Sequence, residues 1–153
     1  MTRWLTPKQM VEQVGQVIGT SDWLVIDQER IDRFADIIED HLFIHVDPEQ
    51  ARDTPFGGTI AHGFLTLSLM TAFMARADLP EPADRSYAVN YGSNRVRFLA
   101  PVRSGSRVRA QFRLLGFEER KPGEWLDTRE ITVEIEGGTQ PALICEWMMV
   151  HYY

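Results

Sequence analysis

The segment "DHLFIHVDPEQA", residues 40–51, places a carboxylate and an imidazole five residues apart, at Asp40 and His45. Three apolar residues, 42–44, lie between them, and an ionisable group in an apolar setting is costly unless it is paired or used. If the chain folds back here, one water molecule could sit between the two groups, an acid–base arrangement suited to adding or removing water. The alternative is that Asp40 ends a helix and His45 is an ordinary loop histidine, since single Asp/His pairs are common and carry little specificity.

The segment "GGTIAHGF", residues 57–64, is the second candidate. An apolar helix is predicted to begin near His62 or Gly63, and the first backbone N–H groups of a helix have no partner within it and carry the positive end of the helix dipole. Gly63 has no side chain, so the oxygen of a carbonyl or thioester could approach these N–H groups closely and occupy an oxyanion site. The alternative is that the glycines only turn the chain and that His62 caps the helix.

The other notable polar side chains have simpler interpretations. Six arginines in an acidic chain could attract a ligand that carries phosphates, because guanidinium matches phosphate well, but for most of them we favour a solvated strand face. Cys145 stands in an apolar segment and is expected to pack in the core rather than to act as a nucleophile. His41 and His151 are expected to be surface or structural residues. The six arginines are Arg95, Arg97, Arg103, Arg107, Arg109 and Arg113.

The candidate pair lies in a short connection, residues 40–46, between two predicted helices. The first helix covers 27–40: Asp27 is expected to cap it, and an apolar stripe follows at helical spacing. The second begins after Asp47, its expected cap, and has Pro48 at the first helical position. The connection is therefore pinned at both ends, which limits where the two side chains can lie.

The rest of the chain predicts helices first and a sheet afterwards. A helix is expected over 6–19 and a short strand over 22–26. Another helix is expected over 63–77, and it is apolar on nearly every side. A helix of that kind belongs inside a protein. After Pro80 the pattern changes to period two, which predicts antiparallel strands around the buried helix, an α+β architecture. The strands are expected within 86–102, 106–120, 124–138 and 141–153.

Length and composition suit one soluble globular domain that covers residues 1–153. Hydrophobic residues make up 44% of the chain and charged residues 25%, and the net charge of −6 argues against nucleic acid as the main partner. No apolar run approaches the roughly 20 residues that span a bilayer, and the first residues lack the apolar stretch of a signal peptide, so no membrane partner is expected. The single cysteine excludes an intrachain disulfide, argues against a structural zinc site and fits a reducing cytoplasm, so a cytoplasmic location is expected.

Three segments of the chain read "FADIIEDHLFIHVDPEQA", "FGGTIAHGFLTLSLM" and "NYGSNRVRFLAPVRSGSRV". Together they resemble the MaoC-like dehydratases, a family that includes the (R)-specific enoyl-CoA hydratases and the NodN-like nodulation proteins, and the likeness runs from about Ile31 to Val108. The resemblance implies a hot-dog fold, in which an antiparallel sheet wraps around a long central apolar helix. It also implies a homodimer or a larger assembly that binds acyl-CoA in a tunnel near the subunit interface.

The resemblance implies the reversible hydration of a trans-2-enoyl-CoA to an (R)-3-hydroxyacyl-CoA. The catalytic aspartate and histidine of the family fall on Asp40 and His45, and the N–H group that binds the thioester oxygen falls on Gly63. It implies neither a metal nor a redox cofactor, because CoA arrives as part of the substrate. With this resemblance, Asp40 and His45 become the predicted catalytic residues.

The sequence departs from the commonest family pattern beside the candidate pair. Many hydratases read Gly-Asp-x-Asn-Pro-x-His, whereas Glu39, Leu42 and Phe43 stand here at the glycine, asparagine and proline positions. The loss of a polar side chain at Leu42 would remove a hydrogen bond that orients the pair or its water. Two other functions therefore stay open: a hot-dog module that binds an acyl thioester or a protein partner without turnover, and an acyl-CoA thioesterase.

Overall fold

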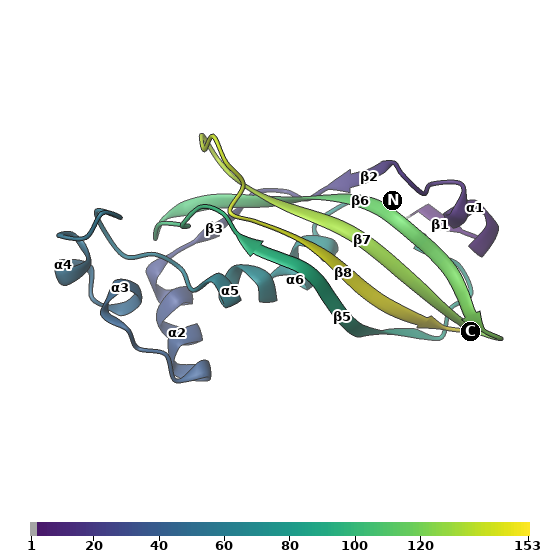
Figure 1. The fold of residues 1–153 in the computed structure, drawn as a ribbon, viewed down its shortest axis with the longest axis horizontal. Helices are drawn as coiled ribbons and strands as arrows, with labels where there is room; N and C mark the ends of the chain where they lie inside the picture. The colour runs from purple at the N-terminus through teal and green to yellow at the C-terminus, as the bar shows by residue number, and fades with distance from the viewer. Residues whose placement is uncertain (1–2) are drawn as a thin grey trace.

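A long, curved antiparallel sheet forms the body of the molecule in the computed structural model, which describes residues 3–153 (Figure 1). The strand order is β2-β6-β7-β8-β5, and β3 also pairs with β6. Each of the four period-two segments forms one of the long strands, so the predicted sheet and the α+β class are confirmed. The strands are β2 (Val17–Thr20), β3 (Leu24–Ile26), β5 (Tyr87–Phe98), β6 (Ser106–Lys121), β7 (Glu124–Ile135) and β8 (Leu143–Tyr152).

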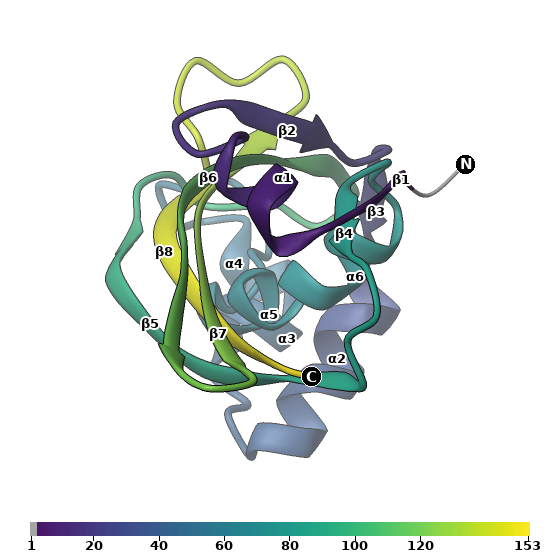
Figure 2. The ribbon, with the colours of Figure 1, turned by 90° about the vertical axis from the view of Figure 1, so that its right-hand side faces the viewer.

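Two short helices, α5 (Gly63–Ser68) and α6 (Met70–Ala75), lie one after the other within the curve of this sheet (Figure 2). They replace the single helix predicted over 63–77, because the chain bends at Leu69, where ψ is −1°. On the sheet side Phe73 is fully buried. A sheet that wraps around a central helical segment is the hot-dog fold, so this prediction is confirmed. Neither these helices nor any others in the described part of the chain are long and apolar enough to cross a membrane.

The prediction that the central helix is buried on every side is wrong for one of its faces. Phe64 is 64% exposed, and Ser68 and Thr71, which follow on the same face, are exposed as well. The opposite side carries Leu65 and Phe73, which are buried against the sheet. A large aromatic side chain left open on a central helix marks a candidate interface.

The N-terminal segment differs from the helix predicted over 6–19. Only α1 (Pro7–Val11) is helical, and the residues after it form β2, which pairs with β6. Gly15, with φ at +88°, turns the chain between the two elements. Pairing with the sheet overrides the helical periodicity, because it satisfies the backbone of β2 and buries one side of it. The sequence pattern also missed β1 (Arg3–Leu5) and β4 (Pro80–Pro82), which form a separate two-stranded parallel sheet.

Three helices lie together at one end of the molecule, beyond the sheet: α2 (Gln28–Ile38), α3 (Phe43–Val46) and α4 (Pro48–Ala51) (Figure 1). The side chains of Asp27 and Asp47 accept hydrogen bonds from N–H groups in the first turns of α2 and α4, so both predicted caps are confirmed. The connection between α2 and α4 is therefore pinned as predicted. The sequence did not predict α3, because four residues are too few to show a helical repeat.

A cluster of three ionisable side chains is fully buried on β7 and β8. Nε of Arg129 donates to both carboxylate oxygens of Asp127, at 3.0 and 3.1 Å, and its Nη2 donates at 2.6 Å. Nε2 of His151 donates to the same carboxylate at 3.0 Å. Arg85 donates to Nδ1 of His151 at 2.9 Å, which fixes the tautomer of that ring. Burial raises the pKa of Asp127, but the charge of Arg129 and the hydrogen bonds from His151 and Arg129 outweigh burial and hold the pKa below its ordinary value. His151 is thus a structural residue, as predicted.

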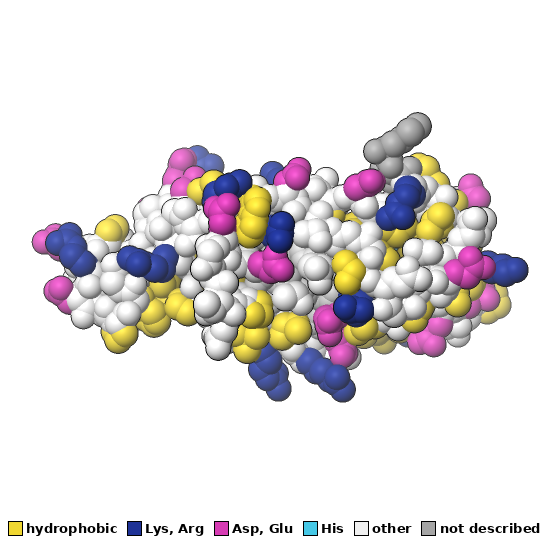
Figure 3. Space-filling model, turned by 90° about the horizontal axis from the view of Figure 1, so that it is seen from above, with side chains coloured by type: hydrophobic (Ala, Val, Ile, Leu, Met, Phe, Trp, Pro, Cys, Tyr) yellow, Lys and Arg dark blue, Asp and Glu magenta, His cyan; other side chains and the backbone are white. Residues whose placement is uncertain are grey.

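Acidic and basic side chains are interspersed on the face of the molecule shown in Figure 3, rather than gathered into one basic patch. Four of the six arginines singled out in the sequence form ion pairs with glutamates, with N–O distances of 2.7 to 3.8 Å. The solvated strand face is therefore confirmed for these four. Arg97 and Arg103 donate instead to the backbone carbonyls of Val96 and Gly57. The four pairs are Arg95–Glu146, Arg107–Glu136, Arg109–Glu134 and Arg113–Glu130.

Two further expectations on single residues are confirmed. Cys145 is buried beside Met70, and burial raises the pKa of its thiol to about 11, so it packs in the core as a protonated thiol and is not an activated nucleophile. His41 is a surface residue, and its Nε2 lies 2.8 Å from the carboxylate of Asp36.

Candidate active site

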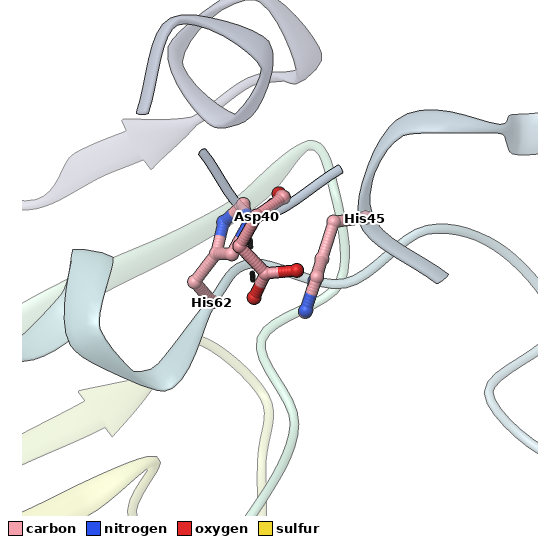
Figure 4. Close-up of side chains that lie close together, drawn as sticks. All are labelled: Asp40, His45 and His62. Atoms are coloured by element: carbon pink, nitrogen blue, oxygen red, sulfur yellow. Dashed lines mark hydrogen bonds and ion pairs between the residues drawn. The ribbon is translucent and has the colours of Figure 1, made fainter. Parts of the chain in front are cut away.

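Asp40 follows the end of α2, and its carboxylate points toward the ring of His45 (Figure 4). Glu39 closes α2 in the left-handed conformation, with φ at +59°, and turns the chain so that Asp40 leaves the helix. The side chain of Asp40 is 48% exposed, and its Oδ1 accepts a hydrogen bond from the backbone N–H of Leu42 at 3.2 Å. The leucine side chain offers no polar group, so this backbone N–H is the hydrogen-bond donor that residue 42 gives the carboxylate.

His45 sits in α3 and is only 8% exposed. Its Nδ1 lies 2.7 Å from the backbone oxygen of Ile60, which can only accept, so Nδ1 carries a proton. In the neutral ring, Nε2 then keeps its lone pair and can take up a proton. The side chain of Gln28 also holds the backbone carbonyl of His45, at 2.7 Å. His45 is thus fixed in a tautomer suited to a general base.

His62, the residue before α5, completes a cluster of three side chains (Figure 4). Its ring stacks on that of His45, with 3.8 Å between the ring centroids, and its Nε2 donates to the backbone oxygen of Asp40 at 3.0 Å. One carboxylate oxygen and one nitrogen of each ring lie within 4.8 Å of one another, close enough for one water molecule to bridge Asp40 and His45. Burial lowers the pKa of His62; the hydrogen bond to Asp40 raises it, but His45 lowers it further, so the ring is neutral near pH 7.

A carboxylate and two imidazoles could also hold a metal ion, but the geometry favours acid–base chemistry. Imidazoles that share a zinc ion direct their lone pairs at it from about 2 Å. Here the two rings lie face to face, at 25° to each other, so their lone pairs run side by side instead of converging. In addition, Nδ1 of His45 and Nε2 of His62 are both engaged by backbone carbonyls.

Gly63 opens α5 and shares a pocket of about 220 Å³ with His45. Its N–H group donates to no acceptor in the described part of the chain, so it can bind a ligand oxygen. A Cβ at this position would lie 2.9 Å from the ring of Phe98, so a larger residue would force that ring to move. The pocket is mostly apolar, and Asp40 does not line it. The carboxylate of Asp40 instead lies on the solvent side of His45. The site therefore places a candidate base and a candidate oxyanion donor on one small pocket, with a carboxylate outside the pocket but close to His45.

Sequence reasoning gave His62 no role beyond capping the helix, and its side chain makes no capping hydrogen bond. His62 is 22 residues from Asp40, and no local pattern predicts that the two meet. The signal that could have found it is the Ala-His-Gly start of the helix, because a histidine there precedes the predicted oxyanion donor, Gly63.

Comparisons with known proteins agree on one family. Residues 9–135 match a family model described as the MaoC like domain. Nodulation protein N of Rhizobium leguminosarum bv. viciae is 48% identical over 139 residues, which cover 90% of this chain and 86% of that protein. The 3-hydroxyacyl-thioester dehydratase Z of Mycobacterium tuberculosis is 47% identical over 132 residues, 86% of each chain. A solved structure described as an (R)-hydratase from A. caviae involved in PHA biosynthesis is 25% identical, with a TM-score of 0.71, and the match covers 89% of this chain and 94% of that one.

Proposed function

Because this chain belongs to the MaoC-like dehydratase family, we propose that it catalyses the reversible hydration of a trans-2-enoyl-CoA to an (R)-3-hydroxyacyl-CoA. The names of its relatives, a 3-hydroxyacyl-thioester dehydratase and an (R)-hydratase, support the type of reaction and the hand of the product. The observation that carries the proposal is the tautomer of His45. The Ile60 carbonyl holds the proton on Nδ1, so Nε2 is left with the lone pair of a base, and the ring lies within one water molecule of the Asp40 carboxylate.

In the proposed mechanism, Asp40 and His45 hold one water molecule between them. Nε2 of His45 takes a proton from this water as its oxygen attacks C3 of the enoyl group. The carboxylate of Asp40 orients the water, and a proton from the pair is delivered to C2. One water molecule is thereby added across the double bond, and no other reactant is needed.

Gly63 would bind the thioester oxygen in this mechanism. Negative charge moves toward that oxygen as C3 is attacked, and the intermediate resembles an enolate. The N–H of Gly63 opens on the same pocket as His45, so it can donate to the oxygen while the water attacks. A hydrogen bond that strengthens as charge develops lowers the barrier, and one such donor is typically worth about 10²–10³ in kcat.

The direct test is the hydration of crotonyl-CoA by the wild-type protein, followed as the loss of enoyl-thioester absorbance. We expect (R)-3-hydroxybutyryl-CoA as the product, identified by chiral chromatography, and the reverse reaction when this compound is supplied. Release of free thiol without hydration would instead identify a thioesterase. Binding of acyl-CoA without turnover, across a series of chain lengths, would identify a binding module and overturn the proposal.

We further propose that the protein is a homodimer joined through β5. In the described part of the chain this strand lies at the sheet edge and pairs with β8 alone, and Tyr87, Val89 and Tyr91 are each between 44% and 58% exposed. Exposed apolar sheet edges are normally protected. Antiparallel pairing of β5 with its own copy is self-complementary, so a two-fold dimer would cover both edges. Phe64, which packs on Phe98 at the end of β5, would extend the same interface.

Val89→Lys is expected to break this dimer. Across a two-fold interface the two lysines would lose water and repel each other, so we expect the dissociation constant to rise at least about 100-fold. Light scattering after size-exclusion chromatography should give twice the chain mass of 17.6 kDa for the wild type and the chain mass for the variant. Val25→Lys is the matched control, because Val25 is also 44% exposed but lies on β3, beside β6. A monomeric wild-type protein, or a Val89→Lys variant that stays dimeric, would count against β5 as the interface.

A further inference from the structure

We propose that His62 is a positioning residue that fixes Asp40 and His45 relative to each other and to Gly63. This inference rests on the proposed function, because it adds a group that the same reaction needs. His62 is only 3% exposed and does not line the pocket shared by His45 and Gly63, so it would act through its neighbours and not on the substrate.

The first contact anchors Asp40. Nε2 of His62 donates to the backbone oxygen of Asp40 at 3.0 Å and lies 3.9 Å from its carboxylate. The carboxylate itself is half exposed, and Leu42 N–H gives it one hydrogen bond of 3.2 Å. Its position therefore depends on where the backbone of Asp40 is held, and His62 ties that backbone to the start of α5.

The second contact holds the ring of His45 in place by stacking. The His62 ring stacks on it at 3.8 Å and meets Phe34 at 5.3 Å between centroids, so it is wedged between the two. Because His62 immediately precedes Gly63, the same residue links both members of the pair to the N–H group proposed to bind the thioester oxygen.

The unpaired nitrogen of His62 argues that the residue is not there for stability alone. Its Nδ1 is buried and has no hydrogen-bond partner among the described residues, which is unfavourable in a protein interior. A phenylalanine would fill the same space without that penalty, so what the histidine adds is the donor at Nε2. The neutral state of the ring also matters, since a positive charge on His62 would oppose the proton uptake by His45.

The test compares two substitutions of His62. His62→Phe keeps an aromatic ring against His45 but removes the donor, and we expect kcat for crotonyl-CoA to fall on the order of 10²-fold while KM changes less than about threefold. His62→Gln keeps an N–H donor, so its kcat is expected to be about tenfold higher than that of His62→Phe. The thermal midpoint of His62→Phe should stay within about 4 °C of the wild type, because the variant loses the unpaired acceptor. His41→Phe, the same change at an exposed position, should leave kcat within about twofold.

Crystal structures of the wild type and His62→Phe give a readout that needs no activity. We expect the Asp40 carboxylate to move by about 1 Å or more relative to His45, a displacement large enough to cost the expected activity. An unmoved pair, or an unchanged kcat in an active protein, would overturn the positioning role. If the wild type does not hydrate crotonyl-CoA but the pair moves in His62→Phe, the positioning role stands and the proposed function fails.

Discussion

Asp40→Asn and His45→Gln are each expected to lower kcat for the hydration of crotonyl-CoA by about 10²–10⁴-fold, the range that general acid–base groups contribute. In His45→Gln the buried base is lost, because an amide cannot take a proton from water near pH 7. In Asp40→Asn the charge that orients the water is lost. The asparagine oxygen can still accept the hydrogen bond from Leu42, so the local backbone should not change.

The chain offers a matched control for both substitutions. Asp36 and His41 are also five residues apart, and their side chains meet at 2.8 Å, but they are 76% and 54% exposed. Asp36→Asn and His41→Gln should keep kcat within about twofold, because an exposed pair of this kind contributes little to structure. Activity that survives in both Asp40→Asn and His45→Gln would show that the pair does not carry the reaction.

The position of the candidate pair could be predicted because the signals that place it are local. The helix that Asp27 starts ends at Ile38, and Asp47 caps the start of α4, so the connection between them is too short for Asp40 and His45 to separate widely. Glu39 shows where a local pattern misleads: the commonest family sequence has glycine there, which suits a left-handed backbone, yet glutamate adopts φ at +59°. The left-handed turn before Asp40 therefore forms here with glutamate in place of glycine.

Apart from the short helix α3, the features that the sequence did not predict depend on contacts between distant segments. The helical pattern over 6–19 fails because β6 offers that segment an edge to pair with, and no pattern within the segment shows it. The role proposed for His62 depends on two neighbours, Asp40 and His45, which reach it only through the fold. The central helix is open at Phe64 because no other described segment covers most of that side chain, which its apolar sequence pattern does not show.

Arg129→Met is expected to lower the free energy of unfolding by about 3–5 kcal/mol at pH 7, the largest stability effect that the structure predicts. The substitution leaves the carboxylate of Asp127 fully buried, with His151 as its remaining partner in the described cluster. Arg109→Met is the matched control: Arg109 pairs with Glu134 at 2.7 Å, but both side chains are more than one-third exposed, so its loss should cost less than about 1 kcal/mol. Urea denaturation of both variants measures the difference.

The pH dependence of this loss tests its cause. In the wild type the pKa of Asp127 lies below its ordinary value of 3.8, so the carboxylate contributes stability above about pH 4, and this is lost as the pH falls through the folded-state pKa. Without Arg129, burial is the main influence and should raise that pKa above the unfolded value. The folded variant is then destabilised at neutral pH, and it regains stability as Asp127 takes up a proton. We therefore expect the difference in free energy of unfolding between the wild type and Arg129→Met to become smaller between pH 7 and pH 4. A difference that stays constant over this range would mean that lost packing, rather than an unpaired buried charge, destabilises the variant.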